Sequence, residues 1–212
     1  IEKHIMKKIV LLVILFVGSH GFSQSLPINF EGDVTTSDFV DFDGGTAAVI
    51  ANPFMSGINM SASIARIVRD GGATYAGSKI LLTDNLDFSV LTKLSMKVYT
   101  TAPAGTIVKF KLEGTGPSAE VDAITTVSSE WETLEWIFAG TPNNLNEIVF
   151  MFDFGTVGDG SANSTFLFDD VEQIDITGGL SQIDLPVNFE EETVNYKMID
   201  LHKYLTIYFF IK

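Results

Sequence analysis

The sequence contains no cysteine and only three histidines among its 212 residues. These histidines, His4, His20 and His202, lie near the ends of the chain, so the long central region has none. The lack of cysteine excludes disulfides and thiol nucleophiles. The lack of a central histidine excludes the usual serine–histidine–acid triad and zinc sites built on imidazole. A metal in this region must therefore bind oxygen ligands, which favours calcium or magnesium.

Positive charge is also scarce. Lysine and arginine total 13 against 27 acidic residues, a formal net charge of −14. Nucleic-acid binding needs a basic surface, so this balance argues against a nucleic-acid partner. An acidic surface suits a hard cation and solubility outside a cell.

One apolar run, Ile9–Val17, stands near the start, and it is too short to span a membrane. It follows Met6 and the positive pair Lys7 and Lys8, which is the pattern of a secretory signal peptide. We interpret residues 1–23 as a signal peptide with leader sequence before Met6. The expected location is therefore secreted or at the cell surface, with no membrane insertion after cleavage.

Residues 24–176 consist of short alternating runs separated by glycine, proline, asparagine and aspartate, and no convincing helix. Lys93–Thr100 and Thr106–Glu113 both alternate apolar and polar residues, which predicts an antiparallel hairpin with a polar outer face. The predicted fold is all-β: an antiparallel β-sandwich of the jelly-roll type.

The chain contains an internal repeat. Leu185–Glu190, LPVNFE, copies Leu26–Glu31, LPINFE, with one substitution. Residues 177–184 are interpreted as a linker and residues 185–212 as the truncated start of a second repeat with an aberrant tail. This organisation predicts a monomeric module within a fragment of a longer, multi-module protein.

Carboxylates cluster near both ends of the predicted sandwich. In the strand Thr165–Gln173, Phe166 and Phe168 share one face, and Asp169 and Asp170 follow directly. Adjacent aspartates repel and are disfavoured in strands, so a positive partner is expected. If the first and last strands lie side by side, Glu31 joins this pair and the group shares a calcium ion. The alternative is that these acids are solvated strand ends.

A sugar site needs aromatic faces and hydrogen-bonding side chains. The candidates are Tyr75, Tyr99, Trp131, Lys109, Lys111 and Glu113. Trp136 is assigned to the core instead, because it shares its face with apolar residues of the same strand. Two alternatives stay open: Tyr75 is an ordinary loop tyrosine, and the lysines only form salt bridges with nearby glutamates.

Several segments occur in an order that resembles a known family. They are the opening LPINFE, the Gly44-Gly45 loop, the run LSMKVYTTAPAGTIVKFKLEG and the closing TFLFDDVE. The order is similar to that of secreted carbohydrate-binding-like modules of polysaccharide-degrading bacteria, which have a galactose-binding-like jelly-roll and are found beside family 16 glycoside hydrolases. The resemblance implies a structural calcium held by Glu31 and Asp169 or Asp170, with Asp43 as a further candidate.

The resemblance also implies a polysaccharide partner, a β-glucan or an algal glycan. The alternative is a structural or adhesive repeat of a surface protein without a sugar site. Catalysis is not expected. Glu120–Thr125 begins like the Glu-x-Asp-x-x-Glu strand of family 16 enzymes, but Thr125 stands where the second carboxylate is required.

Overall fold

A computed structural model describes residues 24–175. The predicted signal peptide, the linker from residue 177 and the second repeat lie outside the described residues. Within residues 24–175, no helix has the length and apolar character needed to cross a membrane.

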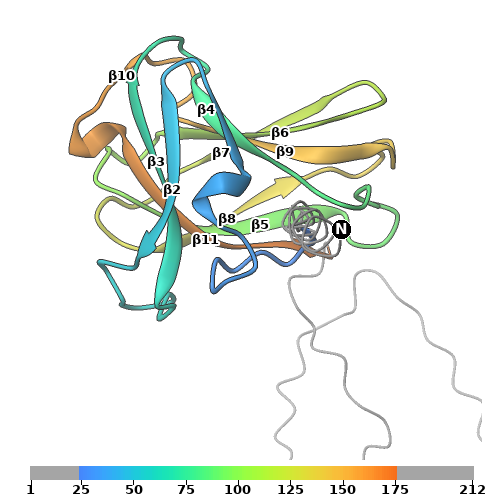
Figure 1. The fold of residues 1–212 in the computed structure, drawn as a ribbon, viewed down its shortest axis with the longest axis horizontal. Helices are drawn as coiled ribbons and strands as arrows, with labels where there is room; N and C mark the ends of the chain where they lie inside the picture. Colours follow the sequence, from blue (N-terminus) through green and yellow to red (C-terminus); the bar gives the residue numbers. More distant parts are fainter. Residues whose placement is uncertain (1–23, 176–212) are drawn as a thin grey trace, which may run out of the picture. The chain divides into compact units, whose positions relative to one another are not determined.

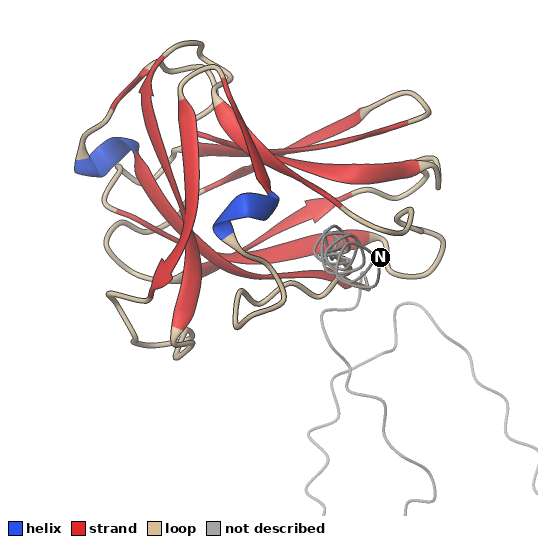
Figure 2. Ribbon diagram, viewed as in Figure 1, coloured by secondary structure: helices blue, strands red, loops and turns tan. Residues whose placement is uncertain are grey.

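The described residues form two antiparallel sheets (Figures 1 and 2). The five-stranded sheet has the order β1 (Phe39–Phe42), β4 (Gly77–Leu81), β9 (Leu145–Phe152), β6 (Ile107–Gly114) and β7 (Ala119–Ile124). The six-stranded sheet has the order β10 (Gly158–Asp159), β3 (Ser63–Gly71), β11 (Thr165–Ile174), β5 (Lys93–Thr100) and β8 (Glu132–Ile137), with β2 (Gly45–Ala51) paired to β3. Two short 3-10 helices, η1 (Thr36–Asp38) and η2 (Ala162–Ser164), complete the described elements. The prediction of an all-β sandwich is confirmed.

The core lies between the sheets and is rich in phenylalanine. Phe166 and Phe168 point inward from β11, as the alternation predicted, and both are fully buried. Phe168 lies 4.8 Å from Phe150 and 5.4 Å from Phe152, measured between ring centroids. These contacts join β11 of one sheet to β9 of the other. Trp136 is also fully buried, in agreement with its assignment to the core.

The predicted hairpin of Lys93–Thr100 and Thr106–Glu113 is wrong. Both segments are strands, but β5 pairs with β11 and β8, whereas β6 pairs with β7 and β9. The turn at Pro103-Ala104-Gly105 therefore carries the chain from one sheet to the other. Alternation identifies which face of a strand is buried, but it carries no information about the partner strand.

The two ends of the sandwich meet, as predicted. Ile28 and Val171 form an antiparallel bridge with N–O distances of 2.9 Å in both directions. The register of β11 against β5 shifts between Asp169 and Glu172, which marks a β-bulge. Asp170 lies in this bulge with φ of 47°, a left-handed conformation that aspartate tolerates better than most residues.

Candidate ligand-binding cleft

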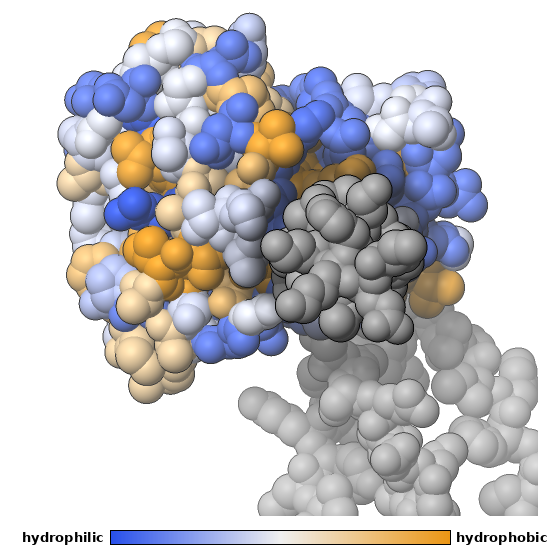
Figure 3. Space-filling view, viewed as in Figure 1, coloured by the Kyte–Doolittle hydropathy of each residue, from blue (hydrophilic) through white to orange (hydrophobic). Residues whose placement is uncertain are grey.

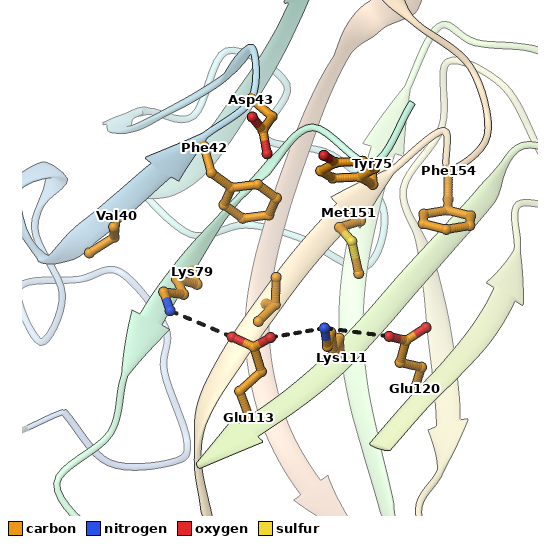
Figure 4. Close-up of a pocket in the computed structure, with 11 residues that line it drawn as sticks. Val40, Phe42, Asp43, Tyr75, Lys79, Lys111, Glu113, Glu120, Met151 and Phe154 are labelled. Atoms are coloured by element: carbon orange, nitrogen blue, oxygen red, sulfur yellow. Dashed lines mark ion pairs between the residues drawn. The ribbon is translucent and has the colours of Figure 1, made fainter. Parts of the chain in front are cut away.

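A cleft of about 470 Å³ lies on the outer face of the five-stranded sheet (Figure 4). One row of cross-strand neighbours spans all five strands: Val40, Lys79, Val149, Lys111 and Glu120. All five line the cleft. Because residues that pair across strands point to the same face, the side chains of this row all project toward the cleft.

Three aromatic rings lie in a row along one side of the cleft (Figure 4). Phe42 comes from β1, Tyr75 from the loop after β3, and Phe154 from the segment after β9. Tyr75 is 50% exposed. Gly77 makes room for Phe42, because a Cβ atom there would lie 3.0 Å from the tip of the ring. The rings offer flat apolar faces to a ligand.

Charged side chains alternate along the other side of the cleft (Figure 4). Glu113 lies 3.5 Å from the Lys79 ammonium and 2.9 Å from that of Lys111, which lies 3.6 Å from Glu120. The hydrogen bond from Lys111 lowers the pKa of Glu113, and the same bond raises the pKa of Lys111. A hydrogen bond to Glu147 raises the pKa of Lys79. These groups are therefore charged at neutral pH and present fixed donors and acceptors.

Three of the six predicted sugar-binding residues, Tyr75, Lys111 and Glu113, line this cleft. Lys109 lies on the same face of β6, two residues from Lys111. Its ammonium is 3.0 Å from Asp122 and 4.4 Å from the centre of the Phe154 ring. Lys109 therefore supports the end of the aromatic row. The salt bridges expected as the alternative for these lysines are present, since Lys111 pairs with Glu113 and Glu120 and Lys109 pairs with Glu120 and Asp122.

Tyr99 and Trp131 lie elsewhere. They are on the outer face of the six-stranded sheet, and each is only 8% exposed. The β2–β3 loop covers them: Phe54 stacks on Tyr99 at 4.4 Å, and the Trp131 indole donates a hydrogen bond to the Phe54 carbonyl. The structure does not bring these two residues to the cleft. Their role is to hold the loop against the sheet.

The tip of the same loop is apolar and exposed. Phe54, Met55, Ile58 and Met60 are each at least 44% exposed. In Figure 3, tan residues of moderate hydropathy gather at the lower left, where Figure 1 places this loop. Phe54 thus supplies an exposed aromatic ring outside the cleft.

The predicted metal ligands separate into three settings. Asp169 is fully buried, and its Oδ2 has no hydrogen-bond partner among the described residues. Asp170 forms an ion pair of 2.6 Å with Lys97. Glu31 is exposed, and its Oε1 accepts hydrogen bonds from the backbone N–H groups of Ala62 and Ser63. In residues 24–175, no three acidic or histidine side chains form a ready ligand cluster.

Asp43 lines the cleft and is not near Asp169. Asp43 lies beside Gly71 and Gly72 at one end of β3, whereas β11 places Asp169 next to the pair Phe168–Ala65. The six residue steps from Ala65 to Gly71 correspond to about 20 Å of strand. The structure does not bring Asp43 to the other predicted ligands.

Burial raises the pKa of the Asp169 carboxyl to about 6, and the neighbouring Asp170 charge adds to this. Ser61 and Asn59 lie near enough to favour the ionised form in part, but neither makes a well-formed hydrogen bond to Oδ2. Asp169 is thus a buried carboxylate that the described protein groups compensate only in part: the backbone N–H of Asp170 donates to Oδ1 at 2.9 Å, and Oδ2 has no hydrogen-bond partner among the described residues. The segment Asn59–Ser63 connects it to Glu31, since both acids contact this segment.

Phe42, Phe154 and Lys79 are among the cleft residues that sequence reasoning missed. Phenylalanine in a sandwich is normally core, so Phe42 and Phe154 gave no signal of their own. For Phe42 a usable signal was its parity with Val40 in a strand whose other face holds Phe39. No pattern in the sequence placed β4 between β1 and β9, and that order is what brings Lys79 to Glu113.

Neither a protein-family model nor a curated protein matches the sequence. Solved structures with a similar fold include carbohydrate-binding modules. The family 11 module of a cellulosomal cellulase of Clostridium thermocellum is 19% identical, with 70% of this chain and 92% of that chain covered and a TM-score of 0.49. The CBM22-1 xylan-binding domain from Paenibacillus barcinonensis is 17% identical, with 72% and 97% covered and a TM-score of 0.47.

An exo-β-agarase structure is 10% identical, with a TM-score of 0.50. The match covers 70% of this chain but only 25% of the agarase chain, so the similarity concerns one part of that enzyme. At these identities, the similarity concerns the sandwich fold alone.

Proposed function

We propose that the domain binds a polysaccharide in the cleft of the five-stranded sheet. The observation that carries this proposal is the aromatic row of Phe42, Tyr75 and Phe154 beside the charged row of Lys79, Glu113 and Lys111 (Figure 4). A pyranose ring has an apolar C–H face that stacks on aromatic rings and a rim of hydroxyls that hydrogen-bonds to charged groups. The cleft offers both surfaces side by side.

The favoured ligand is an uncharged glycan, a β-glucan or a neutral algal glycan. Each lysine lining the cleft already has carboxylate partners: Glu113 and Glu147 for Lys79, and Glu113 and Glu120 for Lys111. A polyanion therefore finds no unpaired ammonium group among these residues. Neutral hydroxyls can bridge the existing ion pairs without breaking them.

The proposed activity is binding without catalysis. Glu113 and Glu120 both line the cleft, and most glycosidases use a pair of carboxylates as catalytic residues. A general acid, however, needs a raised pKa, and the hydrogen bond from Lys111 lowers the pKa of Glu113. We further propose that binding takes place outside the cell, because residues 1–23 have the features of a signal peptide.

Tyr75→Ala is expected to weaken glycan binding by about tenfold, since stacking on an aromatic ring contributes on the order of 1–2 kcal/mol. The measurement is affinity electrophoresis on laminarin, agarose and xylan, followed by calorimetry on the best ligand. Phe54→Ala is the matched control: it removes an aromatic side chain of similar exposure from outside the cleft. Unchanged affinity in Tyr75→Ala, or an equal loss in Phe54→Ala, would contradict the cleft assignment.

The alternative function is a structural or adhesive repeat without a sugar site. It predicts that the wild-type domain is not retarded by any glycan of a broad panel. Because the same gels test both functions, a negative result across the panel rejects polysaccharide binding rather than leaving it undecided.

We also propose a structural calcium ion at Asp169 and Glu31. The support is the buried Asp169 Oδ2 without a hydrogen-bond partner, in a domain where only oxygen ligands are available. The side chains of Ser61 and Asn59 lie near Asp169, and the backbone N–H groups of Ala62 and Ser63 hold Glu31 at the same segment. Calcium at this position supplies the positive charge that Asp169 lacks and fastens the first and last segments of the sandwich. Asp170 is a weaker candidate, because Lys97 already neutralises it.

Removal of calcium by a chelator is expected to lower the melting temperature by about 5–10 °C. A ligand at one hundred times its dissociation constant stabilises a protein by about 2.7 kcal/mol, and 1 kcal/mol corresponds to about 2–4 °C in a domain of this size. Scanning calorimetry with calcium, with chelator, and with calcium restored makes the test. A melting temperature that is the same in all three conditions would remove the calcium proposal.

A further inference from the structure

Arg69 occupies a core position near the end of β3. It shares the inward face of the strand with Ala65 and Ile67, and its side chain is fully buried. A buried guanidinium is tolerated only when its N–H groups have acceptors. Burial lowers the pKa of Arg69 and Asp153 partly offsets this, but an arginine stays charged under these conditions.

The first group of acceptors lies in the loop between β3 and β4. The Nε atom of Arg69 donates to the carbonyl of Ala76 at 3.1 Å. Nη2 donates to the carbonyls of Ala73 at 3.3 Å and Thr74 at 3.1 Å. Tyr75, which lines the cleft, lies between two of these residues. Three contacts therefore fix the backbone on both sides of Tyr75.

The second group of acceptors lies in the segment after β9. Nη1 of Arg69 donates to the carbonyl of Asp153 at 2.9 Å and lies 3.7 Å from its carboxylate. Nη2 also donates to the carbonyl of Thr156 at 2.6 Å. Phe154, the third ring of the aromatic row, lies between these two residues. One guanidinium thus holds both loops that carry cleft aromatics.

We propose that Arg69 is a positioning residue for the cleft: by binding both loops at once, it sets the distance between Tyr75 and Phe154. This inference rests on the proposed function, because the spacing matters only to a ligand that contacts both rings. The backbone N–H of Gly155 also donates a hydrogen bond of 3.0 Å to the carbonyl of Thr74, which joins the two loops directly. Lysine cannot replace Arg69, since its donors lie on a single nitrogen and cannot reach five carbonyls in two loops.

Arg69→Lys is therefore expected to weaken glycan binding by about tenfold. Arg66→Lys is the matched control, because it makes the same substitution on the opposite face of the same strand. In a background that carries Tyr75→Ala and Phe154→Ala, Arg69→Lys is expected to reduce affinity less than twofold, since the rings it positions are gone. An equal reduction in both backgrounds would show a general structural effect and overturn the proposal.

Hydrogen exchange supplies a test that needs no ligand. In Arg69→Lys, the amides of residues 73–76 and 153–156 are expected to exchange faster together, while those of β6 and β7 keep their rates. The wild-type protein alone gives a second test, which survives if the variant does not fold: both loops should exchange more slowly than the exposed residues Val90 and Leu91 of the loop between β4 and β5. If residues 73–76 and 153–156 exchange as fast as that exposed segment, the proposal that Arg69 holds both loops is overturned. If no glycan binds the wild type, the proposed function fails, and exchange still decides whether Arg69 holds the loops.

Discussion

Asp169→Asn is expected to stabilise the calcium-free protein at pH 7 by about 2–3 kcal/mol. Burial raises the pKa of this carboxyl to about 6, whereas an aspartate in an unfolded chain titrates near 4. Each pKa unit corresponds to about 1.4 kcal/mol, and some solvent relaxation reduces the total. At pH 7 the folded protein thus holds a buried charge that is only partly compensated, and asparagine removes it. Most substitutions of buried residues destabilise a protein, so an increase in the free energy of unfolding is a distinctive result.

The same group predicts a dependence on pH. Between about pH 4 and pH 6 the folded chain keeps the Asp169 proton that the unfolded chain has lost. The folded state then binds more protons, so the contribution of Asp169 to the free energy of unfolding falls as the pH rises through this window. Below pH 4 both states are protonated, and the wild type and the variant should have similar stability.

Urea unfolding at pH 4 and pH 7, with chelator present throughout, measures the difference in free energy of unfolding between wild type and Asp169→Asn. Asp159→Asn is the control with the opposite sign: hydrogen bonds from Ser161 and Ser164 lower the pKa of Asp159 to about 2, so its loss should destabilise the protein above that pH. If Asp169→Asn is no more stable than wild type at pH 7, the buried charge of Asp169 does not destabilise the folded protein. With calcium, only the wild type should gain stability.

Strand positions and buried faces followed from the sequence, because alternation with a period of two reports burial directly. The inward faces of β5 and β6 are the predicted ones, and Val98 and Phe110 are both buried in the core. Strand partners did not follow. Consecutive strands in a sandwich either form a hairpin or cross between sheets, and a turn such as Pro103-Ala104-Gly105 is compatible with both.

The same ambiguity limited the prediction of the cleft. Tyr99 and Lys111 both face outward from alternating strands, but they belong to different sheets. A long loop then covers Tyr99 through the stacked Phe54, and no periodicity reveals which outward face a loop will cover. Tyr75 was predictable because it follows a glycine-rich turn, where a side chain is usually exposed.

The adjacent aspartates show which structural features a pattern of residue types can predict and which it cannot. Two acids together in a strand indicated a special environment, and the structure provides one at each position. The β-bulge separates them, so that Asp170 reaches Lys97 while Asp169 remains buried. A bulge is one extra residue in a ladder, and only the register of both strands reveals it.

The aromatic core predicts the largest loss of stability. Phe168→Ala is expected to lower the free energy of unfolding by about 3–5 kcal/mol, the usual range for removing a fully buried phenylalanine. Besides Phe150 and Phe152, its ring packs near Phe30 and Phe39, with distances between ring centroids of 5.4 Å and 6.2 Å. The substitution therefore leaves a cavity between the two sheets, lined by rings of the five-stranded sheet and by Phe30, which cannot collapse unless the sheets move together.

Urea unfolding monitored by tryptophan fluorescence measures this loss. Phe54→Ala is the control, because its ring is 44% exposed and its removal should change stability far less. A double-mutant cycle with Phe150→Ala separates ring–ring contact from burial: the rings lie 4.8 Å apart, and a coupling of about 0.5–1.5 kcal/mol is expected. A loss below 2 kcal/mol in Phe168→Ala, or no coupling to Phe150, would mean that the sheets are not joined at this residue.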